Sequence, residues 1–129
     1  MALLTLGVSG AALADGHVAV EAADQSVAGG VVAAEAVMAE ERGWLVVHRT
    51  DAQMKPGPVV GHAPLGPGLN RDVKALLTEP VAPGERLMLM IHSEAGGARP
   101  GIFEYVLGAK EDGPIREDGR LVMAVIEAQ

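Results

Sequence analysis

A chain of 129 residues with no cysteine and a net charge of −7 excludes several classes of protein at the outset. Disulfide scaffolds, zinc ribbons, iron–sulfur proteins and cysteine hydrolases all require thiols, and an acidic surface repels nucleic acid and anionic lipid. The length suits one domain with a core of its own, and because aromatic residues make up only 2% of the chain, that core must consist of aliphatic side chains and methionine.

The first fourteen residues, MALLTLGVSGAALA, are uncharged and end in Ala12-Leu13-Ala14. This run is too short for a transmembrane helix, and small residues at its end are typical of a signal-peptidase site. We therefore expect residues 1–14 to be the remnant of a signal peptide and residues 15–129 to form a single domain. The mature chain would have no transmembrane segment and would be secreted, periplasmic or on the cell surface. The alternative is that the run is retained as an apolar first strand.

From residue 17 onward, short segments of alternating polarity follow one another at intervals of roughly ten residues, separated by glycine, proline and charged turns. Segment 31–39 also contains good helix formers, but Val31, Val32 and Val37 are β-branched and favour a strand. In segment 59–65, Gly61 and Pro64 indicate a position at the edge of a sheet. The expected strands cover residues 17–22, 31–39, 43–50, 59–65, 69–77, 87–92, 102–107 and 120–128.

Segment 87–92 shows the clearest two-residue period. Leu87, Leu89 and Ile91 alternate with Met88, Met90 and His92, so one face is wholly aliphatic and is expected to be buried in the core. About eight short strands with glycine and proline turns are typical of an antiparallel sandwich or barrel, and the chain leaves no room for crossover helices.

Two of the expected strands are apolar on both faces. In segment 43–50, Trp44 and Val46 point one way while Leu45 and Val47 point the other, and segment 120–128 alternates in the same manner. A sandwich core uses only one face of each strand, so we expect the spare faces to be covered by self-association or by a protein partner. The alternative is that a loop or the N-terminal run folds over them.

Several of these segments together resemble a known family. The runs GWLVVHRT, GPVVGHAPL, GLNRDV, LMLMIHSEAGG and GIFEY are similar to the pattern of an uncharacterised domain of secreted and surface proteins in archaea and bacteria. The similarity covers roughly residues 24–118. It implies an Ig-like β-sandwich of about seven to eight strands, usually one module of an envelope protein, and it implies no activity.

The histidines His17, His48, His62 and His92 are scattered without a metal-ligand spacing such as H-x-H, although three of them lie at or near strand ends that a sandwich can bring together. Imidazole and thioether ligands suit copper, which makes Met90, two residues before His92, a further candidate. The alternative function is therefore a small periplasmic copper-binding protein using His48, His62, His92 and Met90. Methionine also fills gaps in a core poor in aromatic residues, which is the competing explanation.

Motifs for catalysis are missing from the sequence. There is no G-x-S-x-G elbow, and Ser93 follows His92 directly, so the two side chains point to opposite faces of a strand. The glycine pair Gly96-Gly97 lacks the Lys-Ser/Thr of a phosphate loop. We expect a non-catalytic module with a structural or protein-interaction role and no cofactor, with copper binding as the alternative.

Overall fold

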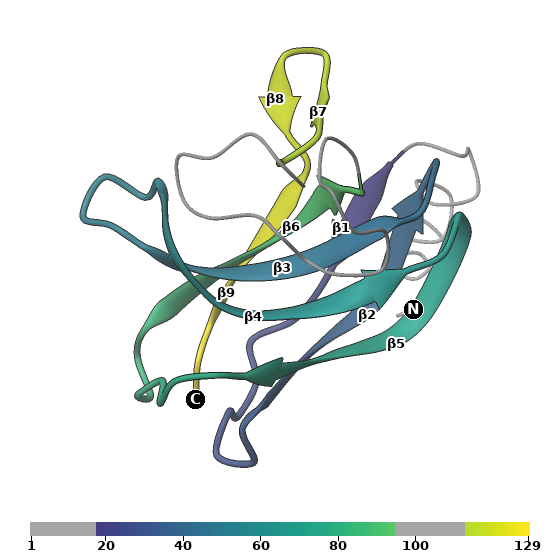
Figure 1. The fold of residues 1–129 in the computed structure, drawn as a ribbon. Coiled ribbons are helices and arrows are strands. Elements are labelled where there is room, and N and C mark those ends of the chain that lie inside the picture. The colour runs from purple at the N-terminus through teal and green to yellow at the C-terminus, as the bar shows by residue number, and fades with distance from the viewer. Residues whose placement is uncertain (1–17, 95–112) are drawn as a thin grey trace, which may run out of the picture.

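A computed structural model describes residues 18–94 and 113–129, and these residues form strands joined by turns (Figure 1). The all-β, antiparallel prediction is confirmed. The strands are β1 (Ala19–Glu21), β2 (Val31–Ala39), β3 (Gly43–Thr50), β4 (Pro56–Leu65), β5 (Gly68–Leu77), β6 (Arg86–Ser93), β7 (Arg116–Glu117), β8 (Arg120–Leu121) and β9 (Met123–Glu127). The signal-peptide prediction and the expected strand 102–107 lie outside the described residues.

Seven of the strands form one antiparallel sheet in the order β1-β2-β5-β4-β3-β6-β9, and β7 pairs with β8 as a separate hairpin. The sheet curls so strongly that its two outer strands approach each other. The segment after β1 makes a parallel bridge to the end of β9, between Gln25 and Ala128. The curled sheet thus has two facing halves around one interior, which is consistent with the predicted sandwich.

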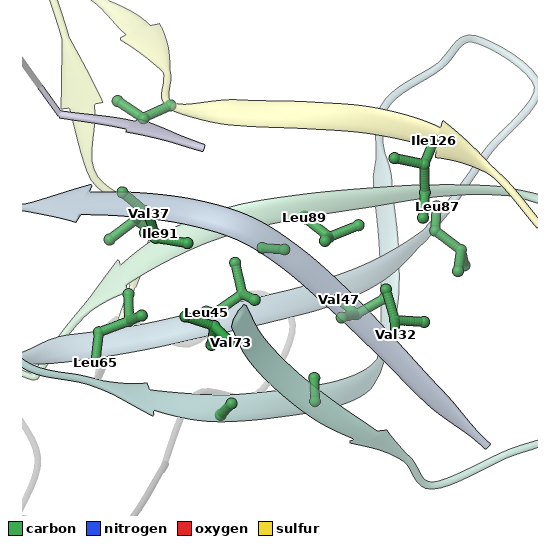
Figure 2. Close-up of a cluster of buried hydrophobic side chains, with 14 of the residues drawn as sticks. Val32, Val37, Leu45, Val47, Leu65, Val73, Leu87, Leu89, Ile91 and Ile126 are labelled. Carbon is green, nitrogen blue, oxygen red and sulfur yellow. The ribbon is translucent and has the colours of Figure 1, made fainter. Parts of the chain in front are cut away.

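The core lies in this interior, and its side chains come from strands on both halves of the sheet (Figure 2). Leu87, Leu89 and Ile91 of β6 are buried there, as their alternation predicts. Leu45 and Val47 of β3 lie beside them, because Leu45 pairs with Ile91 and Val47 with Leu89 in the ladder. Inward side chains from the other strands complete the cluster, among them Val32, Val37, Val73 and Ile126.

The segment GLNRDV, which contributes to the family resemblance, has a structural explanation. Gly68 has a φ of 90°, a conformation that favours glycine, and it follows the tight turn between β4 and β5. The Asn70 amide holds this turn, since it donates to the carbonyls of Gly66 and Gly68 and accepts from the Gly66 N–H. Asp72 has a φ of 51° within β5, and an aspartate tolerates that region better than most residues. The motif therefore shapes the turn and the strand after it.

The edge position expected for segment 59–65 is wrong, because β4 lies between β3 and β5. Glycine and proline are accommodated in this interior strand for local reasons. Pairing with β5 is limited to Gly61 and His62 and ends before Pro64, whose missing N–H therefore costs no bond on that side. At Gly61 an added Cβ would lie 2.9 Å from the carbonyl oxygen of Leu76, so glycine allows the close approach of β5.

The two faces of β3 are both buried within the single chain. Trp44 and Val46 are buried, as Leu45 and Val47 are, so the spare face expected on β3 is not exposed. The expected last strand is divided at Val122 into β8 and β9, and the outer face of β9 leaves Met123 and Val125 38% and 40% exposed. Within residues 18–94 and 113–129, no helix is long and apolar enough to cross a membrane.

Candidate metal site

A second buried layer lies on the outer face of β3 and β6, opposite the core. It is formed by the alternate residues of the two strands, which are Trp44, Val46 and His48 on β3 and Met88, Met90 and His92 on β6. The ladder pairs them in three rows, with Trp44 opposite His92, Val46 opposite Met90 and His48 opposite Met88. The two histidines therefore lie in the outer rows, separated by the row of Val46 and Met90.

The rings of His48 and His92 meet across this middle row. Their Nε2 atoms are 3.2 Å apart, their ring centroids are 5.3 Å apart, and the side chains are 1% and 0% exposed. The β3–β4 ladder shifts register between Val47 and His48, and such a β-bulge redirects the side chain next to it. The structure thus brings together two residues that are 44 positions apart in the sequence.

The protonation of the pair follows from its hydrogen bonds. His48 Nδ1 lies 2.8 Å from the Gly57 carbonyl oxygen, which accepts only, so Nδ1 carries a proton. Burial lowers the pKa of His48, because the imidazolium would lose its hydration, while the hydrogen bond to Gly57 acts in the opposite direction. In the neutral ring, the Nε2 of His48 is then an acceptor whose lone pair faces His92, and the Nε2–H of His92 donates to it.

The other residues of the predicted site are placed differently. His62 of β4 pairs with Val46, so it projects from the same face of the sheet, but it is exposed and its ring packs edge-on against Trp44 at 5.5 Å. Partial burial lowers the pKa of His62 as well. Met90 is buried in the row between His48 and His92. The structure therefore gathers His48, His92 and Met90 on two neighbouring strands and places His62 at the margin.

A cavity of about 300 Å³ opens at the end of β3 and β6, beside this layer. His92 and Ser93 form part of its wall, and the remaining wall includes Val18, Ile91 and Ile115. Its charged lining consists of Glu40, Glu41, Arg42, Glu94, Arg116 and Glu117. Carboxylates outnumber guanidinium groups around the cavity, which therefore favours cations over anions.

Sequence reasoning singled out the individual residues but missed their pairing. The two-residue period places His92 on the face of Met88 and Met90, and the same period places His48 with Trp44 and Val46. Whether these two faces coincide depends on the register of β3 against β6, which the sequence does not encode locally. Gln25 was not singled out at all, although its side chain makes two hydrogen bonds to Ala33 of β2.

Comparison with known proteins gives a family and no function. Neither the curated proteins nor the solved structures contain a match to this chain. One family matches residues 18–129, which includes every strand described above. The chain therefore belongs to the family described as Domain of unknown function (DUF7282).

Proposed function

We propose that this chain is a non-catalytic, Ig-like β-sandwich module of a secreted or cell-surface protein, with a structural and protein-interaction role. The observation that carries the proposal is the position of the two ends of the described domain. The first described residue, Val18, lies at one end of the curled sheet and Gln129 lies at the opposite end, an arrangement suited to a unit that transmits tension along a chain.

The strand register establishes this arrangement. Val18 lines the cavity beside Ile91 and Ser93, so it lies at the far end of β6. Glu127 pairs with Arg86 at the near end of the same strand, and the Gly84 N–H donates to the Ala128 carbonyl. Arg86 and Ser93, at the two ends of β6, are seven residues apart, which corresponds to about 23 Å at the usual rise of a strand. Figure 1 shows β1 in the upper part of the molecule and the C-terminus at the bottom.

A set of hydrogen bonds ties the two terminal segments together where they run parallel. The Gln25 N–H donates to the Glu127 carbonyl at 3.3 Å, and the Gln129 N–H donates to the Gln25 carbonyl at 2.8 Å. The Asp24 carboxylate accepts from the Glu127 N–H at 2.8 Å. A pull on the two ends would slide these segments past each other, so the bonds share the force and must break together. This geometry supports a structural role under tension.

The location outside the cytoplasm is supported by the sequence and is tested by labelling. Lys55 and Lys74 are exposed amines, so a membrane-impermeant biotin ester will modify them on intact cells if the chain faces the medium. We expect labelling of the native protein before lysis, whereas a cytoplasmic control protein is labelled only afterwards. Labelling only after disruption of the outermost membrane indicates the periplasm, and labelling only in the complete lysate rejects the location.

The structural role is tested by pulling single molecules. The full chain is stretched between handle domains fused to its two ends, and in a second experiment between Gln53→Cys and Gln129→Cys. The chain has no native cysteine, so each attachment is unique. Forced unfolding reports the unfolding barrier along the direction of pull. We expect a higher unfolding force when the chain is pulled through the terminal handles than when it is pulled through the two introduced cysteines of the double variant. An unfolding force through the handles that is equal or lower overturns the proposed role.

A further inference from the structure

We propose that His48 and His92, with Met90 between them, form a buried site for one soft monovalent metal ion, Cu(I). This inference is independent of the structural role above and rests on the arrangement of the three side chains. A module of this kind would carry copper without using it for catalysis.

The separation of the two nitrogens fits a shared ion. At the usual metal–nitrogen distance of about 2.0–2.1 Å, two imidazoles bound in tetrahedral geometry have their nitrogens about 3.3 Å apart. The observed Nε2–Nε2 distance is 3.2 Å, so an ion can bind both rings with little movement of either strand. The ion would replace the proton that His92 donates to His48, and His92 would then carry its proton on Nδ1.

His48 is already oriented in the manner of a metal ligand. Its Nδ1–H donates to the Gly57 carbonyl at 2.8 Å, which fixes both the ring plane and the tautomer with Nε2 unprotonated. Histidines that bind metals are almost always held by a hydrogen bond of this kind from the second ring nitrogen. The lone pair of His48 Nε2 therefore faces His92, on the side where the ion would bind.

The surroundings decide in favour of a soft ion of low charge. Met90 occupies the row between the two histidines, with Val46 opposite it and Met88 two residues before it on the same face. Thioether sulfur and imidazole together suit Cu(I). The buried neighbours of the two rings on this face include the apolar side chains of Val46, Met88 and Met90, and a monovalent ion loses less hydration energy on burial than a divalent one.

A cavity lies beside the site. The cavity of about 300 Å³ has His92 in its wall, and carboxylates of Glu40, Glu41 and Glu117 line it. Clefts that carry an excess of negative charge concentrate cations from solution. Copper ions would thus be concentrated next to His92.

The test uses the full chain, anaerobic Cu(I) and the chromogenic competitor bicinchoninate, with Ag(I) as a probe that does not change oxidation state. Trp44 is the single tryptophan and pairs with His92 in the ladder, so its emission reports an ion at the pair. The variants are H48Q, H92Q and M90L, and H62A is the matched control because His62 is exposed on the same face. The circular dichroism spectrum of each variant verifies the fold.

We expect the wild type and H62A to retain one Cu(I) per chain and to show the same change in Trp44 emission with Ag(I). H48Q and H92Q should lose more than the roughly 10–100-fold in affinity that removal of a merely orienting partner costs. M90L preserves volume and should fold, with weaker binding of Cu(I). If H48Q or H92Q fails to fold, the Cu(I) affinity of M90L and the number of Cu(I) ions bound per wild-type chain test the site instead. Wild-type binding no tighter than that of M90L, or a loss confined to H62A, overturns the site.

Discussion

The side chain of Gln25 takes the place of a strand against Ala33 of β2. Its amide nitrogen donates to the Ala33 carbonyl at 2.8 Å, and its amide oxygen accepts from the Ala33 N–H at 2.8 Å. The backbone of Gln25 meanwhile bonds to Glu127, the last residue of β9, and to Gln129 beyond it. One residue thus links β2 to the end of β9 and holds the two edges of the curled sheet together.

Replacement of Gln25 by alanine should therefore weaken the fold. The variant leaves the N–H and carbonyl of Ala33 without these partners, and loss of partners for partly buried groups costs about 1–3 kcal/mol. Urea unfolding followed by Trp44 fluorescence measures the loss. Gln53→Ala in the exposed β3–β4 loop is the control and should change stability by less than about 0.5 kcal/mol. Equal stability of the two variants would contradict the role of Gln25.

Gly43 is predicted to tolerate no side chain. A Cβ at this position would collide with the carbonyl oxygen of His92 on the paired strand β6. Gly43→Ala must push β3 away from β6, and overpacking of this kind costs about 1–3 kcal/mol or more. Gly29→Ala is the matched control, since an added Cβ there meets nothing within 4 Å. Thermal unfolding should show a large fall in Tm for the first variant only.

Leu89→Ala tests the core. Leu89 is fully buried between Val47 of β3 and Ala124 of β9, so truncation leaves a cavity and should cost about 2–5 kcal/mol. Leu76 is 69% exposed on β5, and Leu76→Ala should be nearly neutral. Denaturant midpoints of the two variants check the expectation. A loss below 1 kcal/mol for Leu89→Ala would mean that the interior is not packed as described.

Glu85 is predicted to make the fold sensitive to acid. One carboxylate oxygen accepts from the Ala82 N–H at 2.6 Å and the other bonds to Arg49. The Ala82 hydrogen bond foremost, and then Arg49, hold the pKa of Glu85 below its ordinary value of 4.5. The folded state therefore binds the proton less readily than the unfolded state, so this stabilisation is complete above about pH 5 and is lost as the pH falls through the lowered pKa.

The variant Glu85→Gln isolates this contribution. Its free energy of unfolding should be lower than that of the wild type at pH 7, and the difference should shrink as the pH approaches 3. Glu35→Gln, at an exposed position on β2, is the control, and its free energy of unfolding should vary with pH as that of the wild type does. A difference between wild type and Glu85→Gln that stays constant with pH would show that charge is not involved.

Self-association through an apolar strand face stays a prediction, now restricted to β9. The buried Trp44 and Val46 need no partner to cover them, whereas Met123 and Val125 on β9 are partly exposed. We expect light scattering at micromolar concentration to show an oligomer that Met123→Lys dissociates. Met54→Lys, in the exposed β3–β4 loop, should leave it unchanged. A wild-type chain that scatters as a monomer at every concentration would reject the interface.

The sequence by itself determined the class of fold and the direction of most side chains. Two-residue alternation is a local property of a strand, so the inward positions of Leu87, Leu89 and Ile91 follow from it directly. The burial of Trp44 follows from the same pattern. The strand at residues 31–39 follows from this pattern together with the β-branched residues of that segment. The turn at Gly68 is equally local, because Asn70 bonds to residues two and four positions away.

Only the tertiary structure decided which strands are neighbours and in which register. Pro64 suggested an edge, yet β4 is an interior strand. The proline is accommodated there because the pairing of β4 with β5 ends before that residue. The contact between His48 and His92 and the link between Gln25 and Ala33 likewise depend on register and on the curl of the sheet. These properties arise from pairing energies summed over all seven strands, and no single segment contains them.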